Sequence, residues 1–141
     1  MKKTPTRVLL TGASGNWGRA TLREFATRAD THSVTALALP TERDKAVLAE
    51  FEGMGNLDIV WGDLTDYATV AACVAKTDIV LHVGAVVSPV ADEHPELAQR
   101  VNVGSMRNII KAVRSQPDPA AITVVGIGSV AETGNRNPPF H

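Results

Sequence analysis

Three glycines near the N-terminus constrain the fold of this chain more than any other feature. Gly12, Gly15 and Gly18 lie in the stretch Thr-Gly-Ala-Ser-Gly-Asn-Trp-Gly, between an apolar run and a helix-like segment. A tight strand-to-helix turn needs residues without a Cβ where the backbone approaches the helix or a ligand, and the N–H groups that open the helix favour a phosphate. The pattern predicts a site for the pyrophosphate of a dinucleotide, and an ordinary glycine-rich turn is the alternative. The further residues assigned to this site are Ser14, Asn16 and Trp17.

Apolar runs alternate with helix-like segments along all 141 residues, a length that suits one domain. Most runs are nearly continuous in Val, Ile, Leu and Ala, as parallel strands covered on both faces require. We expect strands over residues 7–11, 33–39, 57–61, 78–83 and 121–127. We expect helices over residues 16–29, 43–53, 66–75 and 95–114. Right-handed crossovers then predict an α/β fold, a doubly wound parallel sheet of strand order 3-2-1-4-5 with helices on both faces.

Charge and cysteine content exclude several classes of function. A net charge of −1 provides no electrostatic footprint for nucleic acid. No apolar stretch is long enough to span a membrane, and the N-terminal one is too short for a signal peptide. The single cysteine, Cys73, excludes an internal disulfide and suits a reducing compartment. We therefore expect a cytoplasmic protein that acts on a small molecule, with no nucleic-acid or membrane partner.

The segments that follow the strands belong at one edge of the sheet, because parallel strands all end there. These segments contain most of the candidate functional residues, although they are spread along the chain. A ligand site is expected at this edge, where the strand order reverses between the first and fourth strands. The fifth strand is an apolar edge, and we expect the chain to self-associate through it.

The glycine spacing, with Thr11 before it, resembles the short-chain dehydrogenase/reductase superfamily and, within it, the extended NAD-dependent epimerase/dehydratase family. Later segments carry the same resemblance in the same order. The resemblance implies a nucleotide-binding domain with a substrate-binding part added toward the C-terminus.

The segment Gly-Asp-Leu-Thr-Asp over residues 62–66 resembles a family motif. The resemblance implies that Asp63 hydrogen-bonds the adenine amino group and that Leu64 supplies backbone contacts. The alternative is that Thr65 or Asp66 is the N-cap of the next helix, and both readings can hold together.

The segment Leu-His-Val-Gly-Ala over residues 81–85 also resembles a family motif. The resemblance implies that Val83, Gly84 and Ala85 let the strand pass close to the riboses of the cofactor. His82 invites a catalytic interpretation, but a histidine at the end of a buried strand is more often a packed, hydrogen-bonded core residue. We favour that structural role.

Two later residues are candidates for catalysis by the same resemblance. Asn102, in Asn-Val-Gly-Ser-Met-Arg-Asn, matches an asparagine that orders the active site and its water; the alternative is a solvated helix residue. Ser129, five residues before Gly134, matches the serine that hydrogen-bonds the reacting oxygen of the substrate; the alternative is a serine of an ordinary turn.

The general acid/base of the family is a tyrosine with a lysine four residues later, and residues 1–141 do not contain this pair. The one tyrosine, Tyr67, is followed four residues later by Ala71. We expect residues 1–141 to be the NAD(P)-binding domain of a longer oxidoreductase, epimerase or dehydratase, truncated before the Tyr-x-x-x-Lys pair and the substrate-binding part. The alternative is a non-catalytic regulator that senses the NAD(P) redox state.

The preference between NAD and NADP is read from the end of the second strand. About twenty residues after Gly18, where an acid would bind the 2′-hydroxyl of the adenosine ribose, the sequence has Ala-Leu-Pro. Arg43 follows and could meet a 2′-phosphate, with Arg19 as a second cation. The sequence therefore leans toward NADP over NAD.

Overall fold

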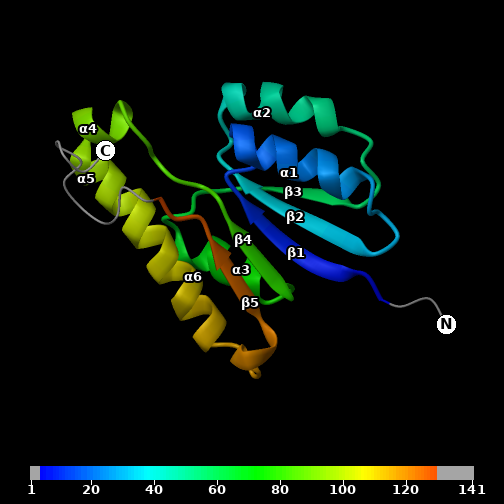
Figure 1. Ribbon diagram of the computed structural model, residues 1–141. Helices are drawn as coiled ribbons and strands as arrows, with labels where there is room; N and C mark the ends of the chain where they lie inside the picture. The colour runs from blue at the N-terminus through cyan, green and yellow to red at the C-terminus, as the bar shows by residue number, and fades with distance from the viewer. Residues whose placement is uncertain (1–3, 130–141) are drawn as a thin grey trace, which may run out of the picture.

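Five parallel strands form the centre of the computed structural model, which describes residues 4–129 (Figure 1). The sheet order is β3-β2-β1-β4-β5, which confirms the predicted order 3-2-1-4-5. The register places Thr11, the last residue of β1, between Leu37 of β2 and His82 of β4. The strands are β1 (Thr6–Thr11), β2 (His32–Ala38), β3 (Leu57–Trp61), β4 (Ile79–His82) and β5 (Thr123–Gly126).

Helices cover the sheet on two faces, as Figure 1 shows. One face packs against α1 (Asn16–Ala26) and α2 (Glu42–Leu48), and the other against α3 (Tyr67–Val74) and α6 (Gly104–Arg114). Alternate residues of β1 pack against the helices on the two faces of the sheet, because successive side chains of a strand point to opposite faces. Val8 and Leu10 are buried with the first pair of helices, and Leu9 with the second.

The helix boundaries differ from the predicted ones where local turns end a helix early. The helix expected over 43–53 ends at Leu48 and continues as a 3₁₀ turn, η1 (Ala49–Phe51). Gly53 then adopts φ +89°, a conformation that glycine favours and that cannot continue the helix. The first helix ends at Ala26 instead of residue 29, and β5 is shorter than predicted because a 3₁₀ turn, η3 (Pro119–Ala121), precedes it.

The helix expected over 95–114 is interrupted. It consists of α5 (Pro95–Ala98), a π-helical segment η2 (Gln99–Val103) and α6, and a short unpredicted helix, α4 (Val90–Glu93), precedes it. A π turn holds one residue more than an α turn, which changes by about 100° the direction in which later side chains project. The residues of η2 face the carboxyl end of the sheet, so the interruption affects the site described below.

The edge strand β5 is exposed along its length. Val125 is 42% exposed, and Ile127, just after the strand, is 56% exposed. Unpaired backbone groups and apolar side chains on an edge strand form a template for another chain. Self-association through this edge stays a prediction.

Candidate functional site

The glycine turn brings β1 against β4 at the carboxyl edge of the sheet. Gly12 has φ +68°, and a Cβ there would lie 2.6 Å from the Cα of Gly84. A Cβ on Gly18 would lie 2.1 Å from the carbonyl oxygen of Gly12. Contacts this short with backbone atoms exclude any side chain, so the packing of the fold itself requires glycine at both positions.

The packing around Gly15 is less restrictive. Its φ of −76° and ψ of 171° are open to any residue, and a Cβ would meet one atom within 4 Å, the Gly12 carbonyl oxygen at 3.3 Å. Gly15 is exposed and is the N-cap of α1. Packing therefore constrains residue 15 less than residues 12 and 18, although a Cβ there would require the Gly12 carbonyl group to shift by a few tenths of an ångström.

Below the turn, a buried hydrogen-bonded chain joins β1, β4 and α6. The Gly84 N–H donates to Thr11 Oγ1 at 3.2 Å, and Thr11 Oγ1 lies 2.8 Å from Nδ1 of His82. Nε2 of His82 lies 3.2 Å from Oγ of Ser105. His82 is buried, and burial lowers the pKa of its imidazole from the ordinary value. The structure confirms His82 as a packed structural residue.

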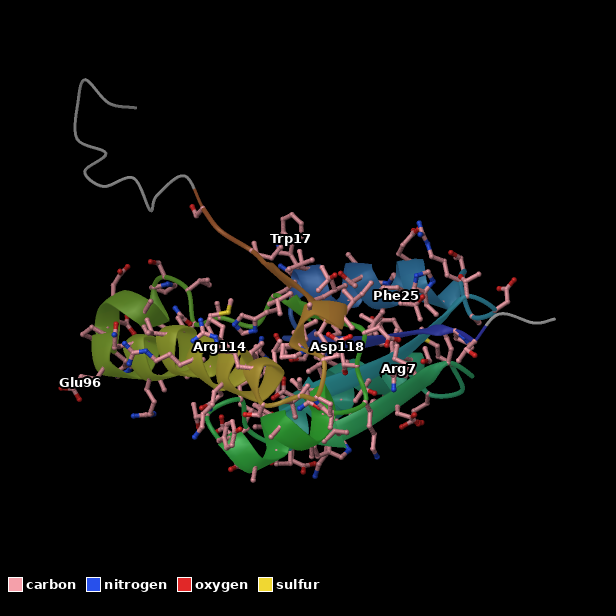
Figure 2. All side chains as sticks on the ribbon, turned by 90° about the horizontal axis from the view of Figure 1, so that it is seen from below. Arg7, Trp17, Phe25, Glu96, Arg114 and Asp118 are labelled. Carbon is pink, nitrogen blue, oxygen red and sulfur yellow. The ribbon has the colours of Figure 1, made fainter. Side chains whose placement is uncertain are left out.

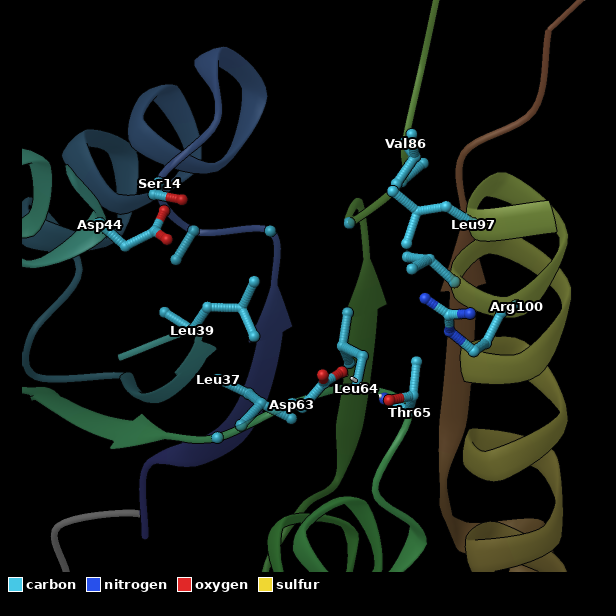
Figure 3. A pocket seen from close by; sticks show the side chains of 17 residues that line it. Ser14, Leu37, Leu39, Asp44, Asp63, Leu64, Thr65, Val86, Leu97 and Arg100 are labelled. Atoms are coloured by element: carbon cyan, nitrogen blue, oxygen red, sulfur yellow. Dashed lines mark hydrogen bonds between the residues drawn. The ribbon is translucent and has the colours of Figure 1, made fainter. Parts of the chain in front are cut away.

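A cavity of about 320 Å³ opens where β1, β2, β3 and β4 end (Figure 3). Apolar side chains such as Leu37, Leu39 and Leu64 form much of its wall. Asp63 lies among them, and Ser14 lies on the side of the glycine turn (Figure 3). The lining residues are Gly12, Ala13, Ser14, Leu37, Ala38, Leu39, Asp44, Gly62, Asp63, Leu64, Thr65, Gly84, Ala85, Val86, Leu97, Arg100 and Val101.

The loop after β3 is held in place from two sides. Asp66 is the N-cap of α3 and accepts from the N–H groups of Ala68 and Thr69, both at 3.2 Å. Its hydrogen bonds to Thr69 and Ala68 hold the pKa of the Asp66 carboxyl below its usual value. Asn108 of α6 donates to the carbonyl oxygens of Leu64 and Thr65, each at 3.1 Å. Asp66 is thus the N-cap of α3, and Asp63 is a separate residue that lines the cavity.

A second cavity of about 600 Å³ lies on the β5 side and shares Gly84 and Ala85 with the first. It brings together Ser129, Asn102 and Trp17, which are far apart in the sequence. Trp17 is 71% exposed and projects from α1 (Figure 2). The lining residues are Trp17, His82, Val83, Gly84, Ala85, Val87, Asn102, Val103, Met106, Arg107, Ile127, Gly128 and Ser129.

Asn102 acts on the backbone between the two cavities. Its Oδ1 accepts from the Val86 N–H at 2.7 Å, and its Nδ2 donates to the Val86 carbonyl oxygen at 2.9 Å. Both hydrogen bonds connect the π segment η2 to the chain that follows β4. Asn102 therefore positions the wall that Gly84, Ala85 and Val86 form.

Several sequence-predicted residues lie outside the lining of both cavities: Gly15, Asn16, Gly18 and Arg43. Asn16 instead accepts a hydrogen bond from Arg19 Nη2 at 3.0 Å. Arg43 is exposed on α2, whereas its neighbour Asp44 lines the first cavity.

Sequence reasoning missed Asp44 and Arg100. Asp44 lies three residues after the N-cap Thr41, whose Oγ1 accepts from the Asp44 N–H at 3.0 Å. The Thr-x-x-Asp spacing could have located this helix start, and with it the carboxylate. No comparable sequence motif marks Arg100, which lies on the π segment η2.

Comparisons with known proteins agree with this geometry. Residues 8–141 match the NAD dependent epimerase/dehydratase family. No curated protein sequence matches the chain. A fold with this strand order and a glycine turn at its carboxyl edge defines a nucleotide-binding domain of the Rossmann type. The chain belongs to the NAD dependent epimerase/dehydratase family.

Solved structures with the same fold include Pen from Bacillus thuringiensis, with a TM-score of 0.76 and 24% identity over 93% of this chain and 39% of that one. Uronate dehydrogenase from Agrobacterium tumefaciens, complexed with NAD, has a TM-score of 0.63 and 23% identity over 89% of this chain and 42% of that one. The UDP-Glc/GlcNAc 4-epimerase of Campylobacter jejuni has a TM-score of 0.77 and 19% identity over 92% and 39%. The chain thus spans about two fifths of the length of each of these structures.

Residues 4–129 lack a membrane-spanning helix and a cluster of metal-binding side chains. In this part of the chain no helix has the length and apolar character needed to cross a membrane. The same residues contain no group of three or more histidine, cysteine or acidic side chains placed to hold a metal ion.

The lowered pKa of His82 predicts how stability depends on pH. The folded state favours neutral imidazole, so its contribution is present above the unfolded pKa of about 6.5 and is lost as the pH falls below that value. The free energy of unfolding, measured by urea denaturation, should fall between pH 7 and pH 5 by about 1.4 kcal/mol per unit of pKa shift. His82→Gln should be less stable at pH 7 and should lose this dependence.

The exposed His94 provides the matched control, and His94→Gln should keep the wild-type dependence on pH. An unchanged pH profile in His82→Gln would show that another group controls stability in this range.

Proposed function

We propose that this chain binds a nicotinamide dinucleotide across the two cavities and serves hydride transfer at a hydroxyl or carbonyl carbon, as an oxidoreductase, epimerase or dehydratase. The observation that carries the proposal is that the two cavities share Gly84 and Ala85 as lining residues, directly beside the glycine turn. Such a path along the carboxyl edge suits an elongated two-part ligand, and family membership supports the use of NAD(P).

The adenosine half fits the first cavity, where Asp63 can accept from the adenine amino group and Leu64 offers its backbone. The pyrophosphate fits the N-terminus of α1, where Gly15 leaves room for close approach and the backbone of Ser14 to Gly18 opens the helix. The riboses lie along the wall of small residues that begins at Val83. In this proposal residues 1–141 are the NAD(P)-binding domain.

The nicotinamide half fits the second cavity, where the bound group supplies or takes up a hydride. Ser129 donates a hydrogen bond to the reacting oxygen of the substrate and so orients it. Asn102 keeps the cavity wall in position through Val86. Trp17, at the mouth of this cavity, shields the ring from water.

Substitution of Gly15 tests the pyrophosphate site. Gly15→Val should weaken dinucleotide binding more than about tenfold, because the side chain fills the space of a charged group whose hydrogen bonds are each worth about 1.5 to 3 kcal/mol. The unfolding free energy should fall by only about 1 kcal/mol, because φ and ψ of Gly15 suit valine although valine is a poorer N-cap and its Cβ lies close to the Gly12 carbonyl oxygen. Calorimetry with NADH measures the binding.

Gly55→Val is the control, because Gly55 is outside the lining of both cavities and a Cβ there meets no atom within 4 Å. Equal binding by Gly15→Val and the unaltered chain would refute the pyrophosphate site.

The choice between NAD and NADP follows from which residue of α2 lines the first cavity. The lean toward NADP depended on Arg43, and the structure gives it no support: Asp44 lines the cavity and Arg43 does not. We propose that NAD binds better, because a carboxylate accepts from the 2′-hydroxyl and repels a 2′-phosphate. Asp44→Asn should reduce the ratio of the Kd for NADP to the Kd for NAD by about tenfold, a difference of about 1.4 kcal/mol.

Glu42→Gln is the matched control, because the Glu42 side chain is 91% exposed and lies outside the cavity lining. Tighter binding of NADP than of NAD by the unaltered chain would contradict the proposal and restore the assignment to Arg43.

Catalysis by residues 1–141 alone should be absent even where the dinucleotide binds. Tyr67 has no lysine four residues later, and a positioned acid/base typically contributes about 10²- to 10⁴-fold. Dinucleotide absorbance over a panel of alcohols and aldehydes measures turnover. Steady turnover would place the acid/base within this chain.

Where a Tyr-x-x-x-Lys pair is present, Ser129→Ala should lower kcat with little change in the dinucleotide Kd.

A further inference from the structure

Arg100 occupies an unusual position for a surface arginine. It is exposed on the π segment η2, and its side chain forms no hydrogen bond or ion pair with any residue in the range 4–129. Glu96 lies four residues earlier, the usual spacing for a helical ion pair, yet the two side chains do not pair. Figure 2 shows Glu96 directed away from the molecule, whereas Figure 3 shows the Arg100 guanidinium directed into the first cavity.

The part of the first cavity beside Arg100 is largely apolar. Leu97 and Val101 line the cavity beside Arg100, and Leu64 lies across from it (Figure 3). The side chain at residue 100 is the one cation among the described residues that line this cavity, and the carboxylates of Asp44 and Asp63 line it elsewhere. A planar cation against an apolar slot suits the face of an aromatic ring.

We propose that Arg100 stacks its guanidinium on the adenine ring of the bound dinucleotide and so closes the adenosine cavity from the side of η2. This inference deepens the proposed function and depends on it. Asp63 would accept a hydrogen bond from the amino group at the edge of the adenine ring, while Arg100 covers the face of the ring.

The position of Arg100 favours the adenine ring over the pyrophosphate. The pyrophosphate belongs at the glycine turn, and in Figure 3 Ser14 of that turn and Arg100 lie on opposite sides of the cavity. Arg100 lies instead near Leu64 and Thr65, in the loop that faces the adenine. A contact with the ring face should survive high salt, whereas an ion pair with a phosphate should weaken.

The test compares Arg100→Met, which keeps much of the length of the stem and removes the cation, with Arg114→Met, in the last turn of α6 and outside this cavity. The ligands are ADP-ribose, adenosine and nicotinamide mononucleotide, measured by calorimetry or NMR titration. Arg100→Met should weaken ADP-ribose and adenosine alike, by roughly 3- to 30-fold at low and high salt. Nicotinamide mononucleotide should bind unchanged, and Arg114→Met should bind all three ligands like the unaltered chain.

The remaining outcomes each overturn the inference. A loss confined to ADP-ribose that disappears in high salt would assign Arg100 to a phosphate. An equal loss of affinity for nicotinamide mononucleotide would show that the substitution disturbs the structure of the whole site. Normal ADP-ribose binding by Arg100→Met would remove Arg100 from the site and leave the proposed function intact. Failure of the unaltered chain to bind ADP-ribose would overturn the proposed function and this inference together.

Discussion

The contact between Gly12 and Gly84 is the constraint on which the rest of the site depends. The backbones of these two residues meet so closely that a Cβ at residue 12 does not fit, and the Gly12 carbonyl oxygen in turn leaves no room for a Cβ at residue 18. Thr11 reinforces the contact from below, since its hydroxyl accepts from the Gly84 N–H and lies within hydrogen-bond distance of His82. Each of these groups is buried or half-buried, so an unmet hydrogen bond here would cost about 1 to 3 kcal/mol. The glycine turn and the wall of the second cavity are thus parts of one packed unit.

Two asparagines extend this arrangement to the loops. Asn102 forms two hydrogen bonds with the backbone of Val86, and Asn108 donates to the carbonyl oxygens of Leu64 and Thr65. Loops at a ligand site carry backbone groups that no neighbouring strand can satisfy. Side-chain amides supply a donor and an acceptor together, so η2 and α6 hold both walls of the first cavity. In this way the helical segments on one face of the sheet hold the walls of the cavity at its edge.

Most of the candidate site could be predicted because its residues follow strands. The order of strands and helices in the sequence places Ser14, Asp63 and Gly84 at one edge of a parallel sheet, and the structure brings these three residues to the same cavity. The exact directions of side chains could not be predicted in this way. Arg43 and Asp44 are neighbours in the sequence, yet only the carboxylate lines the cavity, since the cap at Thr41 determines how α2 begins.

The sequence by itself determined the α/β alternation, the strand order and the glycine turn, because these depend on local periodicity and on the absence of a Cβ. It also indicated that His82 is a core residue, which the hydrogen-bond contacts of its ring with Thr11 and Ser105 confirm. Only the tertiary structure showed that packing constrains Gly15 less than Gly12 and Gly18. It also decided that Arg100, on the π segment η2, points into the first cavity, since neither the π segment nor this direction has a signature in the sequence. Such features arise from contacts between residues distant in the chain, which no pattern of neighbours contains.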